Sequence, residues 1–83
     1  MMELMLYTTL EVRGTAVAYK IYYNLDEHKH FFKPAGLSFY LPRFQVWKKN
    51  GQYYFEGLDD KAVQEQAIAD MENMFAMKAK ALM

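Results

Sequence analysis

The residues with the clearest potential for chemistry lie in one short run, Asp26-Glu27-His28-Lys29-His30. Residues two apart on a β-strand face the same side, so His28 and His30 with a nearby carboxylate could hold a metal ion. The sequence offers no obvious third ligand, and Lys29 and Lys33 would repel a cation. We therefore expect a solvated strand end here, with no metal site and no bound cofactor.

The sequence also lacks a recognisable catalytic set. Ser38 is its only serine and has no Gly-x-Ser-x-Gly context. The four glycines are dispersed at expected turns, so they form no phosphate-binding loop. The carboxylates after residue 58 fall on the wet side and in the first turn of an expected helix, where solubility and the helix dipole explain them. We expect a protein that is not an enzyme.

Length and composition indicate one small domain over residues 1–83. The chain is 53% hydrophobic and 17% aromatic, which is typical of a globular protein. Cysteine is absent, which excludes a disulfide framework and a thiol nucleophile. The N-terminal residues do not resemble a signal peptide, and no apolar run approaches the ~20 residues that cross a bilayer. A cytoplasmic protein is the expectation.

Formal net charge is zero, but the charges are unevenly placed. Basic residues outnumber acidic ones over residues 1–55, and the reverse holds over residues 56–83. This predicts a mildly basic sheet and an acidic helix, short of the strongly basic character of a dedicated nucleic-acid binder. A low net charge also removes a repulsion that keeps copies of a protein apart.

Two hairpins are expected, over residues 4–23 and 44–56. Asn50-Gly51 supplies the two positive-φ residues of a type I′ turn between β-branched and aromatic flanks. Arg13-Gly14 is expected to turn the first hairpin, with Val12 opposite Thr15. That register places on one face the pairs Leu10–Val17, Thr8–Tyr19, Leu6–Ile21 and Leu4–Tyr23. It places on the other face Glu11–Ala16, Thr9–Ala18, Tyr7–Lys20 and Met5–Tyr22.

Residues 59–81 have the pattern of an amphipathic helix. Asp59 is the expected N-cap, and Leu58 is placed to form a hydrophobic staple with Val63. The apolar residues fall on one stripe of the helix, namely Val63, Ala67, Ile68, Met71, Met74, Phe75 and Leu82. We expect this stripe to pack against one face of the sheet.

Residues 24–43 are the hardest to assign. Residues 29–33 have the character of a short strand, Pro34 to Gly36 break it, and Pro42 marks a sheet edge, a bulge or a bend. The segment is either one irregular connection or a third strand with a kinked fourth. The predicted fold is thus α+β, an antiparallel meander sheet of four to five strands with one C-terminal helix packed on one face.

One helix covers only one face of such a sheet, so the other face meets water or a partner. The residues that we expect to bind there are mostly aromatic, namely Met5, Tyr7, Lys20, Tyr22, Trp47 and Tyr54. Tyrosine and tryptophan are favoured in interface cores. We therefore expect a small non-catalytic protein-interaction module that forms a homodimer through this face. Coverage of the face by residues 24–43 is the competing interpretation.

Aromatic residues with basic neighbours on a sheet are also typical of surfaces that bind single-stranded nucleic acid. The basic complement is small, consisting of Arg13, Lys20, Arg43, Lys48 and Lys49, and Glu11 and Glu56 dilute it. A nucleic-acid-binding module is thus the alternative function, less favoured than self-association on electrostatic grounds.

Overall fold

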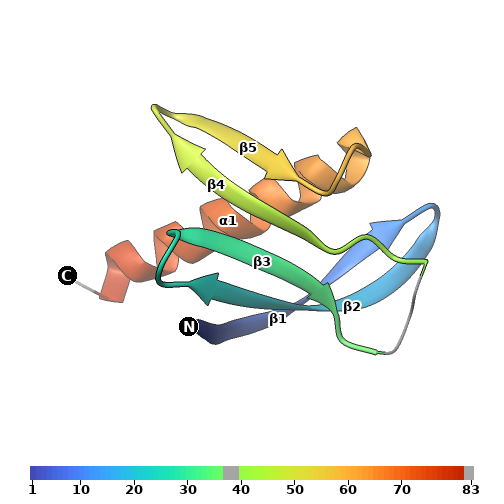
Figure 1. Ribbon diagram of the computed structural model, residues 1–83, viewed down its shortest axis with the longest axis horizontal. Coiled ribbons are helices and arrows are strands. Elements are labelled where there is room, and N and C mark those ends of the chain that lie inside the picture. Colours follow the sequence, from blue (N-terminus) through green and yellow to red (C-terminus); the bar gives the residue numbers. More distant parts are fainter. Residues whose placement is uncertain (37–39, 82–83) are drawn as a thin grey trace.

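A computed structural model describes residues 1–36 and 40–81, the last four of them by their backbone alone. Its elements follow in the order β1 (Met2–Val12), β2 (Thr15–Asn24), β3 (Lys29–Pro34), β4 (Phe44–Lys49), β5 (Gln52–Glu56) and α1 (Lys61–Ala81). The strands form one antiparallel sheet in the order β1-β2-β3-β4-β5, and α1 runs across one of its faces (Figure 1). The predicted α+β meander is confirmed, with five strands.

Both hairpin turns use two residues in the left-handed region. The φ angles are 51° and 80° in Arg13-Gly14, and 55° and 80° in Asn50-Gly51. This is the type I′ geometry, whose twist matches that of the flanking strands. Val12 pairs with Thr15 across the first turn, as predicted, and Lys49 pairs with Gln52 across the second.

The register of the first hairpin changes at Met5. The predicted pairs hold as far as Leu6–Ile21, but Leu4 then pairs with Tyr22 instead of Tyr23. Met5 is the extra residue of a β-bulge and has no partner in β2. The predicted pairs Leu4–Tyr23 and Met5–Tyr22 are therefore wrong, because the bulge interrupts the two-residue alternation on which they depend.

β3 is the central strand of the sheet and pairs with both β2 and β4. Arg13 Nη2 donates to the Tyr40 carbonyl at 2.9 Å, and the Tyr19 hydroxyl donates to the Pro42 carbonyl at 2.8 Å. These bonds hold the described parts of the β3–β4 connection at the end of the sheet, beside the β1–β2 turn (Figure 1). Of the residues 24–43 that the competing interpretation places over the face opposite α1, 29–34 form β3 within the sheet and 37–39 lie outside the described residues.

The core lies between α1 and the face of the sheet that α1 covers. Its completely or almost completely buried side chains include Leu10, Tyr19, Ile21, Phe32, Phe44, Val46, Val63, Ala67 and Met71. Phe32 and Phe44 stack with their ring centroids 4.8 Å apart. Burial raises the pKa of the Tyr19 hydroxyl, which remains hydrogen-bonded within the core.

The helix is capped by Asp60, not by Asp59 as predicted. Asp60 Oδ1 accepts hydrogen bonds from the backbone N–H groups of Ala62 (3.0 Å) and Val63 (3.4 Å). Gly57, which lies between β5 and the cap, has φ 90°, and a Cβ there would lie 2.7 Å from the Arg43 carbonyl oxygen. Glycine is thus required at the point where the chain leaves the sheet.

The predicted apolar stripe of α1 is buried only over its first half. Val63, Ala67 and Met71 are in the core, whereas Phe75 is 40% exposed. Leu82, the last residue of the predicted stripe, lies outside the described residues. In the part of the chain that is described, no helix is long and apolar enough to span a membrane.

Candidate binding surface on the open face of the sheet

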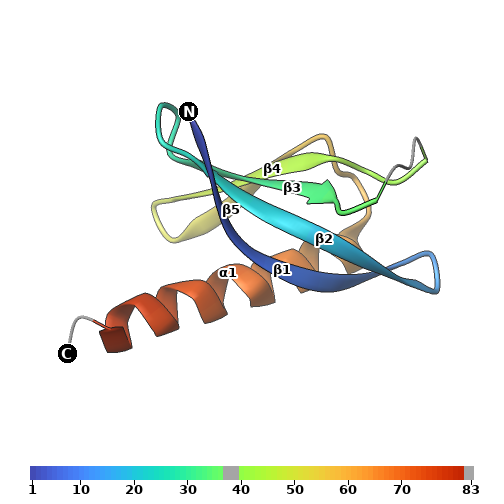
Figure 2. The same ribbon diagram turned by 90° about the horizontal axis from the view of Figure 1, so that it is seen from below.

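The face of the sheet opposite α1 carries no other element among the described residues (Figure 2). We call the sheet face opposite α1 the open face. The strand register and the alternation of side chains along each strand determine which residues lie on it. Its aromatic side chains are Tyr7, Tyr22, Phe31, Trp47 and Tyr54. Its charged side chains are Glu11, Lys20, Lys29, Lys33, Lys49 and Glu56. It is thus a continuous aromatic and polar surface over all five strands.

Trp47 and Tyr54 form the largest aromatic unit of the open face. They are cross-strand partners in β4 and β5, and their rings stack with centroids 5.9 Å apart and planes 17° apart. Tyr54 is 41% exposed, and Trp47 is half-buried. Lys29 Nζ lies 4.4 Å from the centroid of the Trp47 ring, within the range of a cation–π contact. This end of the face presents flat π-surfaces next to a cation.

A second aromatic row crosses the middle of the sheet. Tyr22 pairs with Phe31, and Phe31 pairs with Gln45, so the three side chains lie side by side. All three are half-buried because they cover one another on the sheet surface. The side-chain oxygen of Gln45 is fully buried and has no hydrogen-bond partner in the structure. The middle of the open face is therefore tightly packed and mostly apolar.

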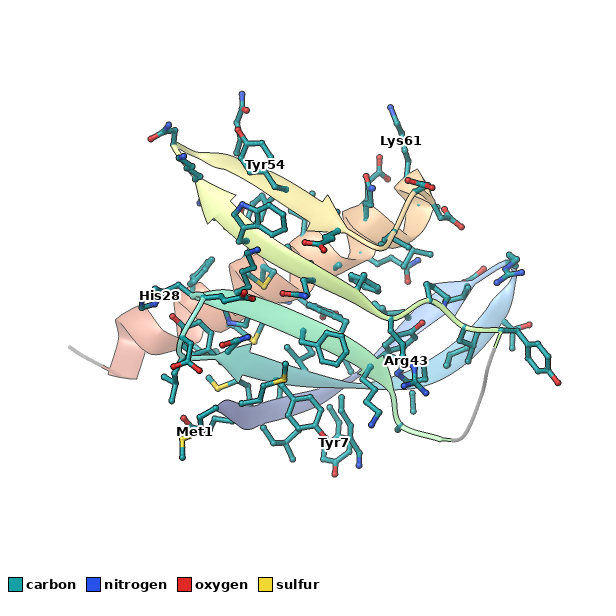
Figure 3. The ribbon with its side chains drawn as sticks, in the orientation of Figure 1. Met1, Tyr7, His28, Arg43, Tyr54 and Lys61 are labelled. Atoms are coloured by element: carbon teal, nitrogen blue, oxygen red, sulfur yellow. The ribbon has the colours of Figure 1, made fainter. Side chains whose placement is uncertain are left out.

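Basic side chains form the next row of the open face, two residues along β2 and β3 from Tyr22 and Phe31. Lys20 pairs with Lys33 across β2 and β3. Arg43 precedes β4, where Figure 3 labels it. Lys20 Nζ lies 5.9 Å from the ring centroid of Tyr7, which is 61% exposed. Among the described residues the only ion pair joins the N-terminal amine to Asp26, so these cations carry no carboxylate partner.

The signs of charge separate by strand. Lys20, Lys29 and Lys33 lie on the central strands β2 and β3, whereas Glu11 and Glu56 lie on the two edge strands. On the central strands the lysines thus lie on either side of the row formed by Tyr22, Phe31 and Gln45, and the two carboxylates lie on the edge strands. An anionic ligand with planar groups would meet lysines and aromatic rings together.

Most of the predicted binding residues lie together on the open face. Tyr7, Lys20, Tyr22, Trp47 and Tyr54 are placed there by their pairing. Met5 is not. Because of the bulge, Met5 lies on the α1 side, where it lines a groove with Met74 and Phe75. The prediction that Met5 belongs to the open face is wrong.

Three residues of β3 were missed by the sequence reasoning, namely Lys29, Phe31 and Lys33. Phe31 and Phe32 are adjacent, so apolar character alone does not tell which of them faces the core. The pairing settles it, because Phe32 is fully buried and Phe31 lies on the open face. Lys48 does not lie on the open face. Its Nζ lies 5.2 Å from the Tyr53 ring centroid and 5.8 Å from the Phe75 ring centroid, on the α1 side of the sheet.

The two histidines do not share one side of a strand. His28 lies in the β2–β3 turn with φ 56°, where its Nδ1 is 2.9 Å from the Tyr23 hydroxyl. His30 is buried, with its ring centroid 4.9 Å from that of Tyr23. The geometry assumed for a His-x-His pair is therefore absent. No group of three or more His, Asp or Glu side chains is placed to hold a metal among the described residues.

Comparison with known proteins gives no relative. No protein-family model matches the chain, and no curated protein and no solved structure gives a significant match.

Proposed function

We propose that this chain is a non-catalytic binding module whose open face binds single-stranded nucleic acid. The observation that carries the proposal is the alternation of lysines and aromatic rings on the open face, where Lys29 lies over the stacked Trp47–Tyr54 pair. Among the described residues these lysines have no carboxylate partner. Any nucleobase can stack on an aromatic side chain, so such binding depends little on nucleotide sequence. Lysines pair with the phosphates that link successive nucleotides. A cytoplasmic location is part of this proposal, because single-stranded nucleic acid is present there.

The geometry suggests a division of roles. Lys29 and Tyr54 flank the Trp47 ring, so a base would stack on the outer surface of Tyr54 or displace Lys29 from Trp47. The backbone phosphates would follow Lys29 and the Lys20–Lys33 pair. Successive rows of one face are separated by about 7 Å along the strands. Several nucleotides would therefore be needed to cover the face, and binding would be weak for a mononucleotide.

Self-association through the same face is the second candidate. The zero net charge of the chain and the exposed rings of Tyr7 and Tyr54 favour it. A second copy packed face to face about a two-fold axis would, however, bring the central lysines of the two copies close together. Such like-charge contacts cost affinity. For this reason we favour nucleic-acid binding over self-association as the function of the open face.

Fluorescence anisotropy with a labelled single strand of about 12 nucleotides tests the proposal. Three phosphate contacts, at Lys20, Lys29 and Lys33, predict a slope of about −2 for the logarithm of the association constant against the logarithm of salt concentration. Lys33→Glu should weaken binding strongly. Lys61→Glu, at the exposed start of α1, is the matched control and should not. Absence of saturable binding at low salt, or binding that is insensitive to salt, would contradict the proposal.

Analytical ultracentrifugation of the same samples separates the two candidates. The nucleic-acid proposal predicts a monomer without oligonucleotide at concentrations of about 100 μM. A dimer that Trp47→Ala converts to monomer would instead establish self-association through the open face.

A further inference from the structure

The outer edge of β1 is partly closed by a side chain of the helix. The Glu11 backbone N–H donates to Gln66 Oε1 at 2.7 Å, and Gln66 Nε2 donates to the Glu11 carbonyl at 2.9 Å. One carboxamide thus makes the two bonds that a neighbouring antiparallel strand would make. Because Glu11 directs both backbone groups outward, alternation directs those of Thr9 and Tyr7 outward as well.

This edge is open only over a short window. Gln66 closes it at Glu11, and the bulge at Met5 interrupts it on the other side. Tyr7 and Thr9 lie between these points. Among the described residues, their outward N–H and C=O groups make no backbone hydrogen bond to a loop or turn. A window of this length is too short for extended edge-to-edge aggregation, but it can pair with a short peptide.

A groove lies alongside the window. In Figure 2, β1 and α1 approach each other near the middle of the helix and diverge toward the N-terminus of β1. The space between them has a volume of about 520 Å³. Its lining includes Leu6, Tyr7 and Thr8 from β1, and Asp70, Asn73 and Met77 from α1. It therefore offers both apolar surface and hydrogen-bonding groups next to an unpaired strand edge.

Asp70 gives the groove its charge. Its Oδ2 accepts a hydrogen bond from the Thr8 hydroxyl at 2.9 Å, and no cation pairs with it among the described residues. Partial burial of the carboxyl raises its pKa, because desolvation penalises the charged form more than the Thr8 bond favours it. A basic side chain brought into the groove would supply the missing countercharge.

We propose that the groove between β1 and α1 binds an extended peptide that carries lysine or arginine. The peptide backbone pairs with Tyr7 and Thr9 as a sixth strand, and its basic side chain reaches Asp70. Backbone pairing of this kind gives affinity that depends little on sequence, and the pocket for the side chain adds specificity. The peptide site uses the outer backbone edge of β1, whereas the proposed nucleic-acid site uses side chains of the open face; Tyr7 contributes its backbone to the first and its ring to the second.

NMR titration of the ¹⁵N-labelled protein tests the inference. The probe is a pool of acetylated, amidated pentapeptides with a fixed central lysine and mixed residues elsewhere. The expected result is saturable shifts of the Tyr7 and Thr9 amides at or below about 1 mM peptide. A matched pool with central glutamate should produce markedly smaller shifts, because it would face Asp70 with a like charge.

Two variants address the two contacts. Thr9→Pro removes an outward N–H without removing a bond to β2, so it should abolish binding while the fold persists. Asp70→Asn should weaken binding, whereas Glu65→Gln, an exposed carboxylate of the same helix, should not. If Thr9→Pro does not fold, N-methylation of the peptide backbone removes the same bonds from the other partner and should abolish binding.

Three results would overturn the inference. These are the absence of saturable shifts at about 1 mM, a folded Thr9→Pro variant that binds the pool as the parent does, and undiminished binding of the N-methylated pool. Translational diffusion without peptide adds a further check. A dimer held by β1 pairing would assign the edge to a second copy of the chain.

Discussion

Lys29 of β3 holds its ammonium nitrogen 4.4 Å from the centroid of the Trp47 ring on β4. The ring stacks against Tyr54 on the neighbouring strand β5. Trp47 is thus flanked by a cation from one strand and an aromatic ring from the other. The lysine comes from the segment that is hardest to assign from the sequence, and its position changes the electrostatic character of the open face.

Lys29→Glu should weaken oligonucleotide binding by about tenfold or more at low salt, because it removes one phosphate contact and adds a repulsion. The salt slope should decrease by about 1 in magnitude. Anisotropy titrations at several salt concentrations measure both quantities. Lys61→Glu carries the same change of charge away from the open face, and an equal loss in that variant would point to net charge alone.

Gln45→Met should stabilise the protein. The Gln45 side-chain oxygen is buried without a hydrogen-bond partner, and such a group costs about 1–3 kcal/mol. Methionine has a similar shape and removes the polar atom, so the free energy of unfolding should increase by about 1 kcal/mol. Urea denaturation measures the change. A decrease in stability would show that the carboxamide is satisfied in solution.

Asp60→Ala should destabilise the protein by about 1 kcal/mol, because Asp60 accepts hydrogen bonds from the N–H groups of Ala62 and Val63 in the first turn of α1. Asp59→Ala is the natural control, since the same charge is removed one residue earlier without the loss of a cap. Thermal denaturation of both variants at one pH compares them. Equal losses would mean that charge near the helix start, and not the cap, is responsible.

Asp70→Asn should change how stability depends on pH. Since burial raises the pKa of Asp70 in the folded state, the folded state binds the proton more tightly than the unfolded state. This group's contribution to the free energy of unfolding therefore falls as pH rises through the unfolded pKa of about 3.9 toward the folded pKa. Relative to the parent, Asp70→Asn should become more stable across that window, as measured by denaturation at successive pH values. A constant difference would exclude a raised pKa, and Glu65→Gln provides the baseline.

The sequence carries enough information for the hairpins, the helix and the side of the sheet on which most residues fall. Asn50-Gly51 and Arg13-Gly14 set the two turns, and the alternation between them and the strand ends sets the faces. These signals are local, since a turn type or a two-residue period needs only neighbouring residues.

The position of the β-bulge and the choice of the helix cap depend on tertiary contacts, which a local sequence pattern does not reveal. Leu4, Met5 and Leu6 are all apolar, so a bulge among them leaves no break in the pattern. Asp59 and Asp60 are equally good caps by type, and tertiary geometry selects Asp60. These differences move Met5 off the open face and set the first residue of the helix.

Trp47 is the only tryptophan of the chain, so its fluorescence reports directly on the centre of the proposed site. Titration with an unlabelled single-stranded oligonucleotide should quench this emission to a plateau, and raising the salt concentration should reverse the quenching. Emission that stays unchanged at saturating oligonucleotide, or that responds only to protein concentration, would contradict a nucleic-acid-binding open face.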